Sequence, residues 1–218
     1  MSRTAAEGFD VGELFDATID SGSSILLTGD DTADIEAVFY RLLAAADNER
    51  SIVLATDDDG RSVTRAFDGI SRGLSDRVEI LTCEGPARAD SVTAIEDMSD
   101  LTAAGMSFST VVANAQQDTD RFRAGIFLAS SICGAVDDTR SVYRFLNSNF
   151  LTELRRGDGL GVCAIDTSAD IGSSTSSMIA GLETSFTGRI DIADSGITGT
   201  TLEISGLDGV PDTVEVDL

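Results

Sequence analysis

The chain has 218 residues, of which 42% are hydrophobic, and its 38 acidic against 15 basic residues give a net charge of −23 at pH 7. The hydrophobic content excludes a disordered acidic tail, and the length suits one domain with a single sizeable core. No apolar run approaches the length of a membrane span and no signal peptide opens the chain, so we expect a cytoplasmic protein with no membrane partner. A surface this negative repels phosphates, so we expect no nucleic-acid partner.

Short apolar runs alternate with helical patterns along most of the chain. The runs have the length and composition of buried parallel strands and lie at residues 24–28, 51–56, 77–82, 108–113 and 160–165. The helical patterns place apolar residues three and four apart and lie at residues 33–46, 61–73, 90–105, 119–135 and 139–156. Strands that alternate with helices predict a mostly parallel sheet with helices on both faces.

The pattern changes after residue 183. The stretch "FTGRIDIADSGITGTTLEISGL" alternates apolar and polar residues around a glycine turn, which predicts an antiparallel hairpin, and "DTVEVDL" predicts a last edge strand. The predicted fold is therefore α/β, a single domain over residues 1–218 whose mostly parallel sheet is flanked by helices and ends in an antiparallel hairpin. Its parts are a lead-in segment at 1–22, an α/β core at 23–183 and antiparallel C-terminal strands at 184–218.

Residues 23–39, "SSILLTGDDTADIEAVF", have the order of a nucleotide-binding strand, loop and helix. A phosphate loop of the form G-x-x-x-x-G-K-[ST] surrounds phosphate with backbone N–H groups and a lysine cation, and its hydroxyl residue holds magnesium. Counted from Gly29, Asp34 stands at the second glycine, Ile35 at the lysine and Glu36 at the hydroxyl residue. The chain contains no lysine at all.

The order of these segments resembles the RecA-type ATPases, specifically the KaiC/RadA branch common in archaea. The resemblance is carried by "GFDVGELFDATIDSGSSILLTG", by "VVANAQQ" at 111–117, by "SVYRFLNSNFLTELRRGDGLGVCAID" and by the closing hairpin. It implies a RecA-like, P-loop NTPase-type fold. It also implies that "VVANAQQ" is the Walker B strand with Asn114 at its aspartate position, and that Asp57 or Asp58 stands where the family keeps a water-activating acid.

The resemblance further implies that Gly29, Asp30, Asp31 and Thr32 form a degenerate phosphate loop. Asp30, Asp31, Asp34 and Glu36 would repel a triphosphate there, so we expect a pseudo-ATPase with no catalytic residue and neither ATP nor magnesium as a cofactor. The first hypothesis is a non-catalytic regulatory or scaffolding protein. Such a protein acts through contacts with a protein partner or with further copies of itself.

Two alternatives remain open. Carboxylates follow the predicted strands, and ligands usually bind at the carboxyl ends of parallel strands. A receiver- or phosphatase-like magnesium site made of Asp30, Asp31 and Asp57 is therefore one alternative, although in a chain with 27 aspartates these residues also fit solvated loops. The other alternative is nucleotide binding without hydrolysis.

The three cysteines, Cys83, Cys133 and Cys163, lie far apart and form no C-x-x-C pair. The chain has no histidine, so neither a zinc site of common type nor an activated serine or cysteine nucleophile is expected. Each cysteine lies in or beside an apolar stretch. We predict three buried, reduced thiols.

The acidic residues are spread through every segment, a pattern that resembles proteins of salt-in halophilic archaea. Repulsion among these charges loosens the domain unless salt screens it, and at 1 M salt the screening length is only about 3 Å. We expect the melting temperature to rise by many degrees between 0.1 M and 2 M KCl. An unchanged melting temperature across that range would contradict the halophilic interpretation.

Overall fold

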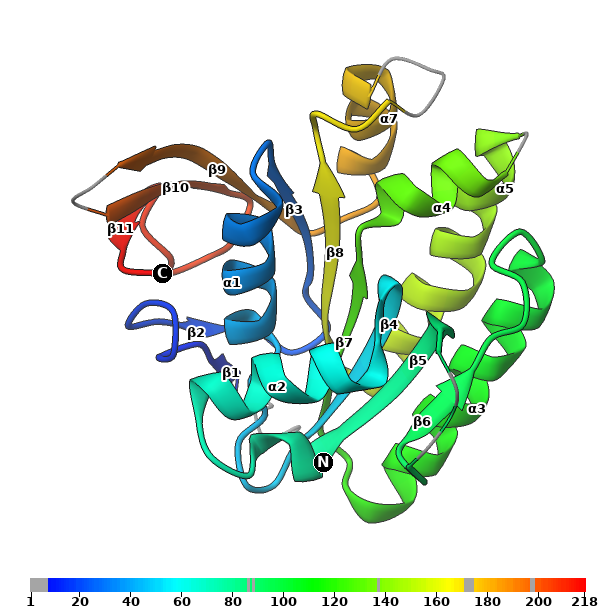
Figure 1. Ribbon diagram of the computed structural model, residues 1–218. Helices are drawn as coiled ribbons and strands as arrows, with labels where there is room; N and C mark the ends of the chain where they lie inside the picture. Colours follow the sequence, from blue (N-terminus) through cyan, green and yellow to red (C-terminus); the bar gives the residue numbers. More distant parts are fainter. Residues whose placement is uncertain (1–7, 86, 88, 137, 171–174, 197–198) are drawn as a thin grey trace, which may run out of the picture.

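The computed structural model describes residues 8–85, 87, 89–136, 138–170, 175–196 and 199–218, so residues 1–7 of the predicted lead-in segment lie outside the described residues (Figure 1). The strands are β1 (Phe9–Asp10), β2 (Thr18–Ile19), β3 (Ser24–Gly29), β4 (Arg50–Asp59), β5 (Val78–Glu84), β6 (Val92–Ala94), β7 (Phe122–Phe127), β8 (Leu160–Asp166), β9 (Gly188–Gly196), β10 (Gly199–Ser205) and β11 (Thr213–Val216). The α-helices are α1 (Thr32–Leu42), α2 (Gly60–Ile70), α3 (Leu101–Asp118), α4 (Ala129–Ala135), α5 (Thr139–Phe145), α6 (Leu151–Gly157) and α7 (Thr175–Glu183).

In this part of the chain, nine strands form one sheet in the order β11-β10-β9-β3-β8-β7-β4-β5-β6. All neighbouring pairs from β9–β3 to β5–β6 are parallel. Strand β10 pairs antiparallel with both β9 and β11. The expected α/β fold with its antiparallel end is therefore confirmed.

Helices cover both faces of the sheet, with α1 and α2 on one face and α3 to α6 on the other (Figure 1). Side chains of β3 alternate between the two faces, as the pleat requires. Ile25 and Leu27 join the cluster under α1 and α2, while Leu26 joins the cluster under α3 to α7. Both faces are thus apolar, which explains why β3 reads as a continuous apolar run.

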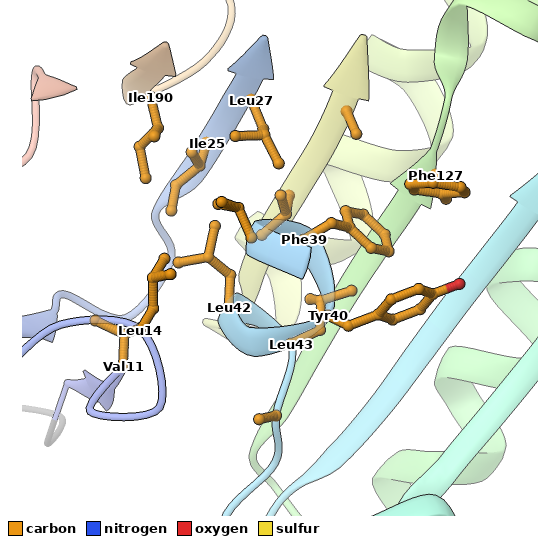
Figure 2. Packing of buried hydrophobic residues seen from close by; sticks show 14 of the residues in the cluster. Val11, Leu14, Ile25, Leu27, Phe39, Tyr40, Leu42, Leu43, Phe127 and Ile190 are labelled. Carbon is orange, nitrogen blue, oxygen red and sulfur yellow. The ribbon is translucent and has the colours of Figure 1, made fainter. Parts of the chain in front are cut away.

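Helix α1 has the amphipathic pattern that the sequence predicts. Figure 2 shows Phe39 and Leu42 against Ile25 and Leu27 of β3, with Leu14 of the lead-in segment nearby. The apolar spacing of three and four residues therefore places one face of α1 on the sheet.

The run at 108–113 is not a strand, because it lies within α3. Its bulky β-branched residues suggested a strand, but the buried positions of the whole segment recur with helical spacing. They are Leu101, Ala104, Gly105, Phe108, Val111, Val112 and Ala115. The side chain of Asp100 caps this helix by accepting hydrogen bonds from the N–H groups of Thr102 and Ala103, so the helix begins at Leu101 rather than at the predicted residue 90.

The helix predicted at 119–135 is also wrong in its first half, because residues 122–127 form β7 and only 129–135 are helical. Arg123 interrupts the apolar run of this strand, and the sequence pattern therefore hid it. The side chain of Arg123 is only 1% exposed. The predicted helix at 90–105 likewise contains the short edge strand β6.

A buried ion pair at the start of β7 explains how Arg123 fits inside. Its guanidinium donates to the Glu49 carboxylate at 2.7 Å, to the Leu42 carbonyl oxygen at 2.9 Å and to the Asp10 carbonyl oxygen at 2.7 Å. Arg121 donates to the other oxygen of Glu49 at 3.0 Å. These bonds join β7, the end of α1 and the lead-in segment.

The structure holds three free cysteines in the described residues, and Cys133 and Cys163 are buried as predicted whereas Cys83 is half-buried. Burial raises the pKa of the Cys133 thiol to about 11, which keeps it protonated at neutral pH.

In the described residues, no helix has both the length and the apolar content to cross a membrane.

We expect Glu49→Gln to lower the free energy of unfolding by about 3–5 kcal/mol, because it leaves the buried Arg123 cation without its anion. The matched control is Asp118→Asn, which removes an exposed pair with Arg50 at 3.7 Å and should cost at most about 1 kcal/mol. Denaturant unfolding in molar KCl measures both. Equal losses would contradict a special role of the buried pair.

Candidate functional site

The predicted phosphate loop is a tight turn at the end of β3. Only Asp30 and Asp31 separate the last strand residue, Gly29, from the first residue of α1, Thr32. A G-x-x-x-x-G-K-[ST] loop needs a longer arc to surround a phosphate with its backbone N–H groups. The positions that correspond to its second glycine and lysine, Asp34 and Ile35, lie inside the helix.

The carboxylate of Asp31 binds the N-terminus of α1. It accepts hydrogen bonds from the N–H groups of Ala33 at 2.8 Å and Asp34 at 3.3 Å, and the Asp31 carbonyl accepts one from Ile35 at 3.0 Å. The N–H groups at the start of a helix are the groups that attract an anion. A carboxylate of the chain itself therefore stands where a phosphate would bind in a nucleotide-binding turn.

Ile35 belongs to the core rather than to a site. Its side chain is fully buried, and a Cβ atom added to Gly29 would lie 3.0 Å from the Ile35 side chain. The lysine position of the motif is thus occupied by a side chain that packs under the turn. This contact also explains the glycine at position 29, because a larger residue would displace Ile35.

The loop after β8 closes the turn from the side. The N–H and hydroxyl groups of Thr167 donate to the Gly29 carbonyl oxygen at 2.7 and 2.9 Å. The hydroxyl of Thr32 donates to the Asp166 carboxylate at 3.3 Å, and Ser168 donates to the other oxygen of Asp166. Asp166, the last residue of β8, therefore links the start of α1 to the loop after β8.

The three candidate metal ligands do not meet. Asp30 and Asp31 follow β3, whereas Asp57 lies in β4, and two strands separate β3 from β4 in the sheet. At the usual strand spacing this places them about 14 Å apart. Within the described ranges, no group of three or more aspartate, glutamate or cysteine side chains is arranged to hold a metal ion.

Asp57 and Asp59 have structural partners. The hydroxyl of Ser131, at the start of α4, donates to the Asp57 carboxylate, and Asp59 caps α2 by accepting from the Ser62 N–H at 2.9 Å. These hydrogen bonds to Ser62 hold the pKa of Asp59 below its usual range. The aspartates at the carboxyl ends of the strands thus position helices and loops.

Helix capping is the signal that the sequence reading missed. Aspartate side chains cap the N-termini of four described helices, namely Asp31 on α1, Asp59 on α2, Asp100 on α3 and Asp138 on α5. An aspartate directly before a helical apolar pattern is a known start signal. This signal predicts that Asp31 and Asp59 cap helices, as they do in the structure.

A groove of about 420 Å³ lies between α1 and α2, and its lining includes Glu36 and Tyr40. Burial raises the pKa of Glu36, and the neighbouring Asp58 carboxylate raises it further. Burial also raises the pKa of Asp58, with Asp57 and Asp59 adding to the effect. The Tyr40 hydroxyl is buried without a hydrogen-bond partner in the described residues.

The expected Walker B position is wrong. Asn114 lies exposed on α3, and the parallel strand in this part of the chain is β7, between β8 and β4. That strand ends in Phe127, and Leu128 and Ala129 follow, so no carboxylate stands at its end. Asp57 and Asp58 do lie at the end of β4, as the resemblance implied.

The sheet order and the helices on both faces define a KaiC-like RecA fold. A KaiC-like protein from the hyperthermophilic archaeon Pyrococcus horikoshii OT3 has a similar structure, with a TM-score of 0.58 and 13% sequence identity over 95% of this chain and 88% of that chain. At this identity the likeness concerns the fold alone. Residues 22–192 match DUF7504, a family of unknown function, and the chain belongs to that family. No curated protein matches the sequence.

We expect Glu36→Gln combined with Asp58→Asn to raise the melting temperature at pH 7.5. Both carboxyl groups have a raised pKa in the fold, so their contribution to stability is complete below about pH 4 and is lost as the pH rises through the raised values. The double variant should therefore also flatten the fall in stability above pH 4. Thermal melts across pH 4–8 measure this.

The control is Glu203→Gln combined with Glu215→Gln, which removes two exposed carboxylates on β10 and β11. An equal rise in melting temperature for this control would show that only the net charge matters.

Proposed function

We propose that this protein is a non-catalytic, RecA/KaiC-like regulatory or scaffolding protein that acts through protein contacts rather than through ATP hydrolysis. The observation that carries the proposal is the Asp31 carboxylate bound to the first N–H groups of α1. In a fold of the nucleotide-binding type, the Asp31 carboxylate then occupies the position at which a phosphate would bind.

Binding a nucleotide phosphate at this turn would first displace Asp31 from the helix. Loss of an aspartate cap costs about 0.5–2 kcal/mol. The incoming phosphate would then lie beside Asp30, Asp31 and Asp34, whose charges have its own sign. Both effects oppose binding.

In this chain, a cation that compensates for these charges would have to be an arginine. The chain has no lysine, and the arginine on the strand beside β3, Arg189, forms ion pairs with Glu183 and Asp191. Hydrolysis would also lack a carboxylate at the end of β7. These features support a protein that keeps the fold and has lost the chemistry.

Titration calorimetry with ATP and magnesium in 2 M KCl tests the proposal. We expect no heat of binding at millimolar ATP and no magnesium-dependent phosphate release above a blank without protein. ADP without magnesium and magnesium without nucleotide are separate arms, because they detect the two alternative functions.

The variant Asp34→Gly/Ile35→Lys/Glu36→Thr restores the residue types of the motif and serves as a comparison. We expect it to lose stability rather than to gain hydrolysis, because the introduced lysine would enter the core that Ile35 now fills. Saturable ATP binding by the unmodified protein that Asp30→Ala or Gly29→Val abolishes would overturn the proposal in favour of nucleotide binding.

A further inference from the structure

The groove between α1 and α2 holds a tyrosine whose hydroxyl group lacks a partner. Tyr40 lines this groove and is only 2% exposed, and its hydroxyl is buried without a hydrogen bond in the described residues. The Tyr40 ring packs on Phe67 at 5.1 Å and on Phe127 at 5.7 Å between centroids, and Figure 2 shows its hydroxyl pointing toward β4. A buried hydroxyl without a partner destabilises a fold, so this one calls for a group that binds from outside.

Two half-buried carboxylates lie near this hydroxyl. Glu36 lines the groove one turn before Tyr40 on α1, and Asp58 lies near the end of β4. Burial raises the pKa of Tyr40, and the charges of Asp58 and Glu36 raise it further, which places the three side chains within electrostatic reach of one another. Within the described ranges, neither carboxylate forms a side-chain hydrogen bond or an ion pair. All three polar groups are therefore unsatisfied at one place.

The floor of the groove suits an aliphatic chain. Ala37 of α1 and Ala66 and Ile70 of α2 line it, and these side chains offer apolar contact without polar groups. Gly69 keeps the groove open on the side of α2, because a Cβ atom added there would meet nothing within 4 Å. The volume of about 420 Å³ lies in the range of small-ligand sites.

The charged groups along the groove are mostly acidic. Glu13 of the lead-in segment and Asp217 line it together with Glu36. Arg41 lines it too, but its guanidinium donates to the Asp217 carbonyl oxygen at 3.0 Å and is directed to that end of the groove. An apolar floor with net negative charge is complementary to a cation on an aliphatic stem.

We propose that this groove binds an arginine side chain of a partner protein, with the guanidinium at Glu36 and the Tyr40 hydroxyl and the stem along Ala37 and Ala66. A guanidinium has five N–H donors in one plane, so it donates to a carboxylate and to a phenol oxygen at the same time. A hard metal ion fits less well, because it takes about six oxygen ligands. In the described part of the chain, no three acidic or cysteine side chains are grouped to hold one.

Such a site explains why the chain keeps side chains that destabilise it. The raised pKa values of Glu36 and Asp58 and the unsatisfied Tyr40 hydroxyl all lower the stability of the unbound protein at neutral pH. A bound guanidinium supplies hydrogen bonds and a positive charge to the same groups. Stability is commonly lost in this way where side chains serve a ligand. The inference rests on the proposed role in protein contacts and names the chemistry of the partner.

The chain has two tyrosines, which allows a direct test. Tyr143 donates to the Met178 carbonyl oxygen at 3.2 Å on the opposite face of the sheet, so it serves as an internal control. Tyrosine labelled with ¹³C at the ring carbon that bears the hydroxyl gives one NMR signal for each residue, and Tyr143→Phe assigns them. The probe is the blocked peptide Ac-Ala-Ala-Arg-Ala-Ala-NH2 in 2 M KCl, since salt screens partly buried charges less than exposed ones.

We expect the peptide to shift the Tyr40 signal saturably and to leave the Tyr143 signal in place. The same peptide with citrulline, a neutral isostere of arginine, should bind at least about 10-fold more weakly, because it lacks the charge that strengthens the hydrogen bonds. Free spermidine is a further arm, because it carries cationic groups without a polypeptide.

Two variants test the charge and the space separately. Glu36→Gln removes the anion and Gly69→Leu fills the groove, and each should weaken binding of the arginine peptide at least about 10-fold. Gly134→Leu is the matched control for the second variant. Gly134 is likewise exposed and helical, and a Cβ atom there also meets nothing within 4 Å, but it lies on α4 and does not line the groove. This control should bind the peptide as the unmodified protein does.

An unchanged Tyr40 signal at about 20 mM peptide, where even millimolar affinity would saturate the site, would overturn the inference. Equal affinity for the arginine and citrulline peptides, or full binding by Gly69→Leu, would do the same. Tighter binding of spermidine than of the peptide would assign the groove to a small organic cation instead of a protein. No nucleotide is used, so a negative result leaves the calorimetric test of the proposed function unaffected.

Discussion

The ion pair between Arg123 and Glu49 is the interaction on which the arrangement of this fold depends. Removing two charges from water is costly, and the cost is offset only where every donor and acceptor has a partner. Arg123 meets this condition with bonds to Glu49, to the carbonyl of Leu42 at the end of α1 and to the carbonyl of Asp10. One side chain thereby fixes the helix after β3, the strand β7 and the lead-in segment relative to one another. Its environment is buried, so its strength depends less on salt than that of the exposed acidic surface.

At the other end of the strands, the same excess of acid performs a different task. Aspartates at the starts of α1, α2, α3 and α5 bind the N–H groups that each helix leaves unpaired. At α1 this local stabilisation occupies the position at which a nucleotide-binding turn receives phosphate. Helix capping and phosphate binding use the same donors, so one excludes the other. The loss of ligand chemistry that we propose would thus need only a carboxylate one residue before the helix.

The distribution of charge separates two kinds of surface. Carboxylates cover the loops and strand ends, while α3 and its neighbouring helices present neutral and positive side chains.

The sequence by itself determined the fold class, most of the parallel strands, α1, α2 and the antiparallel end, because their apolar runs have the period of the element that they form. It also determined the absence of the lysine on which phosphate binding depends. Only the tertiary structure placed β7 and α3. Arg123 breaks the apolar pattern of β7, and the pairing with Glu49 in the structure explains how a charged residue lies inside that strand. Val111 and Val112 suggested a strand, whereas the burial of Phe108 and Ala115 fits a helix. Only the tertiary structure, too, separated Asp57 from Asp30 and Asp31, since strand order in a sheet follows from packing rather than from order along the chain.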